Sequence, residues 1–206
     1  MSTALLSLQG VHTHIGSYHI LHGVDLAVPA GQVTMLLGRN GAGKTTTLRT
    51  IMGLWHASKG SIHFGGKDIT AMNTPAIAGM NIAYVPENMG IFADLTVKEN
   101  MLLAARSARN SAQMDEARLQ WIFKLFPAVE KFWNHPAGKL SGGQKQMVAV
   151  SRAIVEPRDL LIVDEPSKGL APAIINNMID AFDQLKKSGV TILLVEQNIN
   201  FAKRLG

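Results

Sequence analysis

Residues 38–45 of the chain read Gly-Arg-Asn-Gly-Ala-Gly-Lys-Thr, a Gly-x-x-x-x-Gly-Lys-Thr pattern. A short, mostly apolar run at 33–37 precedes it, and the residues from Lys44 to Gly53 are typical of a helix and its end. A strand, a glycine loop and a helix start direct backbone N–H groups at one point, where a polyphosphate would bind. We therefore predict a phosphate-binding loop, with the Lys44 ammonium at the β- and γ-phosphates and the Thr45 hydroxyl on Mg²⁺. The predicted phosphate contacts are Gly38, Arg39, Asn40, Gly41, Ala42, Gly43, Lys44, Thr45 and Thr46.

Composition and charge narrow the classes of protein to consider. The 206 residues suffice for one domain, or one core with a subdomain, and 47% of them are hydrophobic, so a packed core is expected. The formal charge is +5, but the Lys and Arg residues are scattered rather than gathered in runs, and we interpret them as solvated surface. Cysteine is absent, which excludes disulfides and thiol chemistry.

Targeting and membrane segments are not evident in the sequence. The first ten residues lack the basic start and the long apolar stretch of a signal peptide. No run of about 18 apolar residues is present, so no membrane-spanning helix is predicted. We therefore expect a soluble, cytosolic protein.

Apolar patterning predicts two kinds of strand. Residues 5–8 and 20–28 alternate apolar and polar side chains, as in a half-exposed antiparallel sheet. Residues 58–61 are expected to form a turn into a strand at 62–64, which ends in a hairpin turn at 65–68. Strands of the second kind are short and mostly apolar, at 33–37, 82–85, 160–163 and 191–195. Helical patterns separate them, so we expect a mostly parallel sheet with ligands at the carboxyl ends of its strands.

The stretch at 93–139 is predicted to be mostly helical. Residues 96–99 read Thr-Val-Lys-Glu, a capping box that opens a helix from 97 to about 108, and a second helix is expected at 115–126. We interpret 93–139 as a small helical subdomain inserted into a core formed by 1–92 and 140–206. The predicted fold is an α/β P-loop NTPase core with a mostly parallel sheet, an antiparallel β subdomain at its edge and an inserted α-helical subdomain.

Two carboxylates directly follow a predicted buried strand. Asp164 and Glu165 come after the apolar residues 160–163. Asp164 would hold Mg²⁺ as the acidic partner of Thr45, and Glu165 would polarise a water for in-line attack on the γ-phosphate. An acidic strand end alone is weak support, because exposed strand ends are often acidic. A phosphate loop about 120 residues earlier makes the pair a strong indication of nucleotide hydrolysis.

A second glycine-rich helix start lies at 140–144, where the sequence is Leu-Ser-Gly-Gly-Gln. Ser141 can cap the helix, and Gly142 and Gly143, followed by Gln144, make an N–H-rich anion site. Two such sites in one chain suggest a head-to-tail pair, in which each ATP lies between the loop of one chain and the Ser-Gly-Gly of the other. The plainer alternative is a capped helix with a glycine-rich beginning.

Together these motifs resemble those of the ATP-binding subunits of ABC transporters. The phosphate loop, Leu-Ser-Gly-Gly-Gln and Leu-Leu-Ile-Val-Asp-Glu-Pro have that family's order and spacing, and the resemblance extends from the first strands to Asn198. The finer resemblance is to the branched-chain amino-acid importers and their urea and amide relatives. It rests on Ala-Tyr-Val-Pro-Glu-Asn at 83–88, Glu-Pro-Ser-Lys-Gly-Leu-Ala-Pro at 165–172 and Leu-Leu-Val-Glu-Gln-Asn at 193–198.

The resemblance implies roles at matching positions. Glu87 replaces the family's usual loop Gln, as it does in this subfamily; it would sense Mg²⁺ or its water and touch the membrane subunit. Gln197 replaces the switch His; it would contact the γ-phosphate but cannot carry a proton, which leaves Glu165 as the better candidate base. Residues 141–143 would contact the partner's γ-phosphate, and residues 167–171 would cross the dimer seam. The implied catalytic residues are Glu165, Lys44 and Gln197, and the implied metal ligands are Thr45, Glu87 and Asp164.

Three departures from the family pattern matter. The family stacks an aromatic residue near position 15 on adenine, where this chain has Ile15. Tyr18 is close but out of register; we predict it as the adenine contact, with an apolar contact from Ile15 as the alternative. The usual Asp of the seam loop falls at Ala171. Members also usually continue for some tens of residues after the position of Gln197, so the resemblance implies that this chain, which stops at Gly206, lacks a closing strand and helix.

Four histidines crowd the N-terminal strands, at positions 12, 14, 19 and 22. His12 and His14 share one face of a strand and could bind a metal. No carboxylate or thiolate joins them at ligand spacing, so we favour a solvated strand edge.

The predicted function is an ATPase that binds ATP and Mg²⁺ and powers a membrane importer from the cytoplasmic face of the membrane. Its expected partners are transmembrane permease subunits and a second ATPase subunit, identical or related. Branched-chain amino acids are the expected substrate, with urea or amides next. A nucleic-acid-linked ATPase of the same superfamily is one alternative, although such proteins usually carry two cassettes, coiled-coil arms or zinc ligands, and no nucleic acid is expected here. A non-hydrolysing, ATP-dependent dimerisation module is the other.

Overall fold

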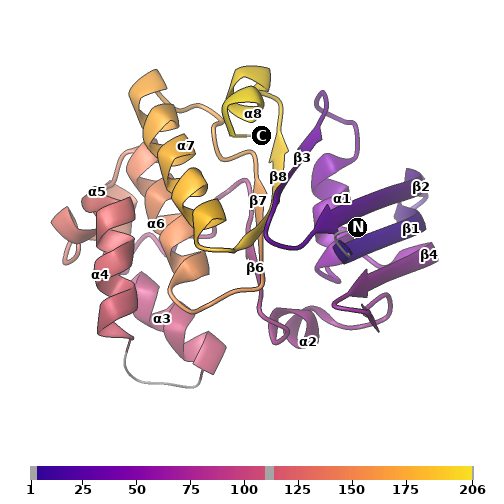
Figure 1. Cartoon of the computed structure of the whole chain (residues 1–206), viewed down its shortest axis with the longest axis horizontal. Helices are drawn as coiled ribbons and strands as arrows, with labels where there is room; N and C mark the ends of the chain where they lie inside the picture. The colour runs from indigo at the N-terminus through magenta and orange to yellow at the C-terminus, as the bar shows by residue number, and fades with distance from the viewer. Residues whose placement is uncertain (1–3, 110–113, 206) are drawn as a thin grey trace.

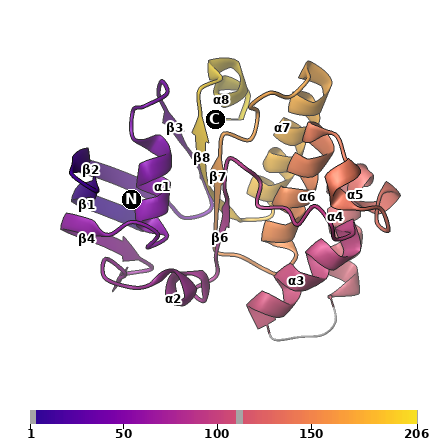
Figure 2. The same cartoon turned by 180° about the vertical axis from the view of Figure 1, so that it is seen from behind.

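The computed structural model describes residues 4–109 and 114–205, in which two sheets lie on either side of helix α1 (Lys44–Ile51) (Figures 1 and 2). One sheet is antiparallel, with the strand order β2-β1-β4-β5, and the other is parallel, with the order β3-β8-β7-β6. The α/β fold predicted from the sequence, with its parallel sheet and antiparallel β subdomain, is confirmed.

The parallel sheet is covered on both faces, which explains its apolar strands. It consists of β3 (Val33–Leu37), β8 (Thr191–Glu196), β7 (Leu160–Asp164) and β6 (Ile82–Val85). Along β7, Leu160 and Ile162 join the core cluster around α1 and the antiparallel sheet, whereas Leu161 and Val163 join the cluster of helices on the other face. Because successive side chains of a strand point to opposite faces, every position of such a strand must be apolar or specifically satisfied.

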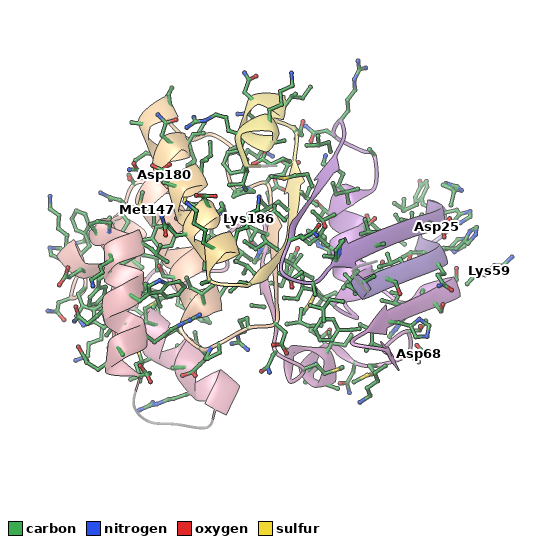
Figure 3. All side chains as sticks on the ribbon, in the orientation of Figure 1. Asp25, Lys59, Asp68, Met147, Asp180 and Lys186 are labelled. Carbon is green, nitrogen blue, oxygen red and sulfur yellow. The ribbon has the colours of Figure 1, made fainter. Side chains whose placement is uncertain are left out.

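The antiparallel sheet is longer than its sequence pattern indicated. β1 (Ala4–Ile15) and β2 (Tyr18–Pro29) form a long hairpin, and β4 (Ala57–Phe64) and β5 (Lys67–Asp68) extend the sheet beyond β1. The turn predicted at 58–61 is wrong, because these residues belong to β4 and pair with β1. Gly60 has a φ of 84° at an irregularity of this pairing, so the glycine marks a bulge rather than a chain reversal. Asp25, Lys59 and Asp68 project from this sheet at the end of the molecule opposite α4 (Glu116–Leu125) and α7 (Pro172–Lys187) (Figure 3).

On the face of the parallel sheet opposite α1, a group of helices covers the strands (Figures 1 and 2). They include α3 (Val97–Arg109), α4 (Glu116–Leu125), α5 (Pro127–Lys131), α6 (Gly142–Ile154) and α7 (Pro172–Lys187). The capping box predicted for α3 is present, because Thr96 N donates to Glu99 Oε2 (2.8 Å) and Glu99 N donates to Thr96 Oγ1 (3.2 Å). The short helices α2 (Thr74–Ala78), α5 and α8 (Ile199–Leu205) and the 3₁₀ turn η1 (Ala137–Lys139) were not predicted, since three to seven residues show too little periodicity.

The ends of the helical stretch lie side by side. Val97 N donates to His135 O (3.1 Å), and Ala137 N donates to Leu95 O (2.8 Å). The residues that lead into α3 therefore lie beside those that lead into α6, so the helical stretch begins and ends at neighbouring points. The division into subdomains at 93 and 139 stays a prediction. In the described parts of the chain, no helix has the length and apolar character needed to cross a bilayer.

Candidate functional site

The predicted site residues collect at the carboxyl edge of the parallel sheet. The phosphate loop follows β3, Glu87 comes two residues after β6, Asp164 ends β7 and Gln197 follows β8. Parallel strands end at the same edge of a sheet, so residues far apart in the sequence become neighbours there.

The phosphate loop, residues 38–43, is shaped by its glycines and supported by β2. Gly41 and Gly43 have φ angles of 82° and 83°, which residues with a Cβ rarely adopt. A Cβ on Gly43 would lie 3.0 Å from Leu21 Cδ2, so the hairpin of the antiparallel sheet packs directly against the loop. No side chain of the described residues caps the N-terminus of α1. Its first N–H groups therefore remain available to an anion.

Lys44 bridges the phosphate loop and the carboxylate after β7. Its side chain is only 6% exposed, and its ammonium donates to the backbone oxygen of Arg39 (3.1 Å). The same nitrogen lies 3.5 Å from Glu165 Oε1. A polyphosphate in the loop would compete with Glu165 for this ammonium.

Glu165 lies at the centre of the site. Its Oε1 accepts a hydrogen bond from Gln197 Nε2 (2.8 Å), and the same amide nitrogen donates to Asn40 Oδ1 of the phosphate loop (2.5 Å). The backbone has a φ of 49°, unusual for a residue with a side chain, and its N–H donates to Val195 O (2.9 Å). Such backbone strain costs on the order of 1–3 kcal/mol and persists where the surrounding structure enforces it. Here it turns the carboxylate toward the loop.

Asp164 is buried, and no cation among the described residues forms an ion pair with its carboxylate. Its residue is 1% exposed, and neither carboxylate oxygen has a hydrogen-bond partner among the described residues. Burial raises the pKa of Asp164, and the nearby carboxylates of Glu165 and Glu87 raise it further, whereas the Thr45 hydroxyl and the Arg49 charge oppose the shift. Two unsatisfied carboxylate oxygens beside a hydroxyl match the oxygen ligands that Mg²⁺ prefers. These residues therefore fit a magnesium ion.

Glu87 and Lys168 form the exposed side of the site. The Lys168 ammonium makes a close ion pair with the Glu87 carboxylate and lies 3.7 Å from Glu165 Oε2. The hydrogen bond to Glu87 raises the pKa of Lys168. From the sequence, Lys168 was assigned only to the loop 167–171, which is predicted to cross the dimer seam. Its spacing of three residues from Glu165 was the available signal, because a turn in which Lys168 N donates to Glu165 O (3.1 Å) brings the two residues together.

Glu196 is a second residue that sequence reasoning missed. It is buried and accepts three backbone N–H groups, from Ser167 (2.9 Å), Gln197 (3.1 Å) and Asn198 (3.2 Å). It thereby ties the loop after β7 to the residues after β8. A buried carboxylate with three N–H donors is satisfied without a cation, so we assign it a positioning role.

The Ser-Gly-Gly motif lies apart from the phosphate loop of the same chain. Ser141 caps α6 in a full capping box with Gln144, where Gln144 N donates to Ser141 Oγ (3.3 Å) and Ser141 N donates to Gln144 Oε1 (2.9 Å). No hydrogen bond or ion pair joins 141–144 to 38–46 in the parts of the chain that the structure describes. The structure thus brings together the loop, Glu87, Asp164, Glu165 and Gln197, but not the Ser-Gly-Gly motif.

The two glycines of this motif face different surroundings, which makes a paired prediction. A Cβ on Gly143 would lie 2.7 Å from Ile174 Cγ2 of α7, whereas a Cβ on Gly142 would meet no atom of the described residues within 4 Å. We expect Gly143→Ala to lower the free energy of unfolding by about 1–3 kcal/mol through overpacking. Gly142→Ala is the control and is expected to change it by less than about 0.5 kcal/mol. Urea unfolding of both variants measures this, and equal stabilities would contradict the packing assignment.

Tyr18 and the histidines lie on the long hairpin. Tyr18 is 73% exposed at the start of β2, opposite Ile15, and its adenine contact stays a prediction. The ring of His19 is the centre of the histidine group, with ring centroids 5.1 Å from His12, 4.2 Å from His14 and 3.9 Å from His22. Desolvation lowers the pKa of His19, and its three neighbours lower it further. His19 stacks on His12 and His14 and is tilted against His22. Within residues 4–109 and 114–205, no group of three or more His, Cys, Asp or Glu side chains is arranged to hold a metal.

Comparison with known proteins places this geometry in a family. The profile described as ABC transporter matches residues 21–168. The high-affinity branched-chain amino acid transport ATP-binding protein BraG of Pseudomonas aeruginosa is 39% identical over 204 residues, which cover 98% of this chain and 85% of that protein. A probable branched-chain amino acid transport ATP-binding protein, LivF of Archaeoglobus fulgidus, is 36% identical over 89% of this chain and 78% of its own.

Other relatives and solved structures widen the comparison. A glutamate transport ATP-binding protein of Corynebacterium glutamicum is 30% identical over 97% of this chain and 83% of its own length. A Nod factor export ATP-binding protein of Burkholderia lata is 33% identical over 100% of this chain and 66% of its own length. The dimeric structure of the bacterial ABC transporter cassette MJ0796 superposes with a TM-score of 0.85 at 25% identity, covering 97% of this chain and 90% of that one.

Proposed function

This chain belongs to the ABC transporter family, as an ATPase that hydrolyses ATP to drive transport, and we propose that it energises an importer of branched-chain amino acids. The observation that carries the substrate class is the 39% identity to a branched-chain amino acid transport protein across 98% of this chain. The relatives described for glutamate transport and Nod factor export are less similar, at 30% and 33%. Urea and amides are the alternative substrates.

Each residue at the carboxyl edge has a proposed task in hydrolysis. The loop N–H groups and the Lys44 ammonium bind the β- and γ-phosphates, which draws Lys44 away from Glu165. Glu165 then accepts a hydrogen bond from the attacking water, and Gln197 holds that carboxylate while also holding Asn40 of the loop. Asp164 and Thr45 would hold Mg²⁺, with Glu87 at the ion or its water; the ion supplies positive charge for the phosphate oxygens.

The Ser-Gly-Gly motif has a task only if two copies face each other. Since it makes no hydrogen bond to the phosphate loop of its own chain in the described residues, its free N–H groups would complete the nucleotide site of a partner. We propose a head-to-tail dimer, with an identical or a related ATPase subunit, that closes on ATP and opens after hydrolysis.

A groove beside Glu87 is the proposed docking surface for the transmembrane partner. Two hollows of about 620 Å³ and 830 Å³ share Tyr84 and Pro86, and Glu87 lines the second. Exposed apolar side chains of Leu54, Phe92 and Leu103 line them. Exposed apolar surface of this kind suits a partner's helix, and such docking would place the chain at the cytoplasmic face of the membrane.

Uptake by the complete transporter in proteoliposomes tests this proposal. We expect ATP-dependent uptake of leucine, isoleucine and valine, and little uptake of glutamate or urea. Leu103→Asp in the groove is expected to lower uptake at least about tenfold while the isolated subunit keeps its ATPase rate, because a buried interfacial charge costs several kcal/mol. Gln120→Asp, an exposed site on α4 outside both hollows, is the matched control. Preferred uptake of glutamate or urea would overturn the substrate class, and normal uptake by Leu103→Asp would overturn the docking surface.

A further inference from the structure

The Lys168 ammonium is the one described cation that contacts both Glu87 and Glu165. It pairs closely with the Glu87 carboxylate and lies 3.7 Å from Glu165 Oε2. The two carboxylates come from different places: Glu87 follows β6, near the proposed docking groove, whereas Glu165 follows β7 and is buried. A positive charge between them is therefore a physical connection between the groove and the reacting centre.

We propose that Lys168 is a positioning residue for ATP hydrolysis, which couples Glu87 at the docking groove to the candidate base Glu165. The inference rests on the proposed function, because it takes Glu165 as the base and Glu87 as the residue nearest the membrane partner. It adds that the loop after β7 carries the signal between them.

The contacts form one continuous line across the sheet. Lys168 joins Glu87 after β6 to Glu165 after β7, and Gln197 after β8 joins Glu165 to Asn40 after β3. This order, β6, β7, β8 and β3, is the order of the strands in the parallel sheet. Of these links, the pair between Lys168 and Glu87 is the one that reaches the residues lining the groove.

The charges explain why this ammonium matters during turnover. Among the described residues, Glu165 has two cationic neighbours, Lys44 at 3.5 Å and Lys168 at 3.7 Å. Once Lys44 binds the phosphates, Lys168 is the ammonium that remains beside Glu165. The Glu165 carboxylate then needs this positive charge because it must stay close to a highly negative nucleotide. Without it, repulsion would move Glu165 away from the γ-phosphate.

A purely structural role does not account for the arrangement. The Lys168 side chain is 54% exposed, and exposed ion pairs contribute little to stability. The Lys187–Asp183 pair on α7, with 2.6 Å between Nζ and Oδ2, offers a matched ion pair remote from these contacts. Lys187→Met therefore controls for loss of an exposed ion pair.

The test is steady-state ATP hydrolysis with Mg²⁺ by the purified chain and its variants. Lys168→Met is expected to lower kcat about tenfold with KM for ATP changed less than about twofold, because Lys168 contacts no phosphate-loop residue in the described structure. Lys168→Arg is expected to recover most of the rate, since it keeps the charge. Lys187→Met is expected to match the parent. Glu87→Gln is expected to lower kcat by a smaller factor in the Lys168→Met background than in the parent, because Lys168→Met has already removed the ion pair between residues 87 and 168.

The outcomes separate this inference from the proposed function. If Glu165→Gln abolishes turnover but Lys168→Met has the parent's kcat, the coupling is wrong while the base assignment stands. A loss in KM rather than kcat, no recovery by Lys168→Arg, or strictly multiplicative effects of the two changes would also overturn the coupling. If Glu165→Gln retains the parent's turnover, the proposed base fails first.

Discussion

Replacing Glu165 by Gln is expected to lower kcat for ATP by about 10²–10⁴-fold, the usual contribution of a positioned general base. The amide keeps the size of the side chain, and its oxygen can still accept the hydrogen bond from Gln197 Nε2, so the fold is expected to persist. It cannot accept a proton from the attacking water. Steady-state phosphate release with Mg²⁺, compared with ATP binding by equilibrium titration, measures the effect.

Two comparisons make the Glu165 prediction specific. Glu130→Gln removes the same charge from an exposed position on α5 and is expected to leave kcat unchanged. ATP binding by Glu165→Gln is expected to equal or exceed that of the parent, because loss of the carboxylate frees Lys44 for the phosphates. Turnover by Glu165→Gln within about threefold of the parent would show that another group activates the water.

Replacing Asp164 by Asn is expected to abolish Mg²⁺-dependent turnover while making the nucleotide-free protein more stable. The loss is expected to exceed about a hundredfold, because the carboxylate is the candidate ligand for the ion that neutralises the phosphates. The gain arises because Asp164 is buried with both oxygens unpaired among the described residues. Removing an unsatisfied buried charge is expected to raise the free energy of unfolding by about 1 kcal/mol at pH 7.

The pH dependence gives this prediction a sign. Burial raises the pKa of Asp164 above its usual 3.8, so the folded state holds the proton more tightly than the unfolded state. The loss of stability caused by burying the Asp164 charge is absent below the unfolded pKa. It grows as pH rises from the unfolded to the folded pKa and is complete above the folded pKa. The stability advantage of Asp164→Asn should therefore be present at pH 7 and shrink toward pH 4. Urea unfolding at both pH values measures it, with Asp159→Asn, exposed just before β7, as the control. An advantage that grows toward pH 4 would contradict the assignment.

Local signals made much of the fold predictable. The parallel strands, the hairpin turn and the cap at Thr96 each depend on residues within a few positions of one another, so spacing and residue type suffice to find them. The turn predicted at 65–68 extended too far, since Lys67–Asp68 form β5. The error at 58–61 arose because Ser, Lys and Gly are typical both of turns and of a bulged edge of a strand. Only the pairing of β4 with β1 distinguishes the two.

The candidate site divides in the same way between local and long-range information. The sequence by itself determined the phosphate loop, the acidic pair at the end of β7 and the cap of α6, because backbone conformation and capping depend on neighbouring residues. Only the tertiary structure decided which of these groups touch. It joined Lys168 to Glu87 across 81 positions and Gln197 to Asn40 across 157, and it placed Ile174 against Gly143. Among the described residues, it left both Asp164 carboxylate oxygens without a hydrogen-bond partner and placed no atom against Gly142. The reason is that these contacts depend on the order of strands in the sheet and on the packing of α6 against α7, and neither leaves a mark at fixed spacing in the sequence.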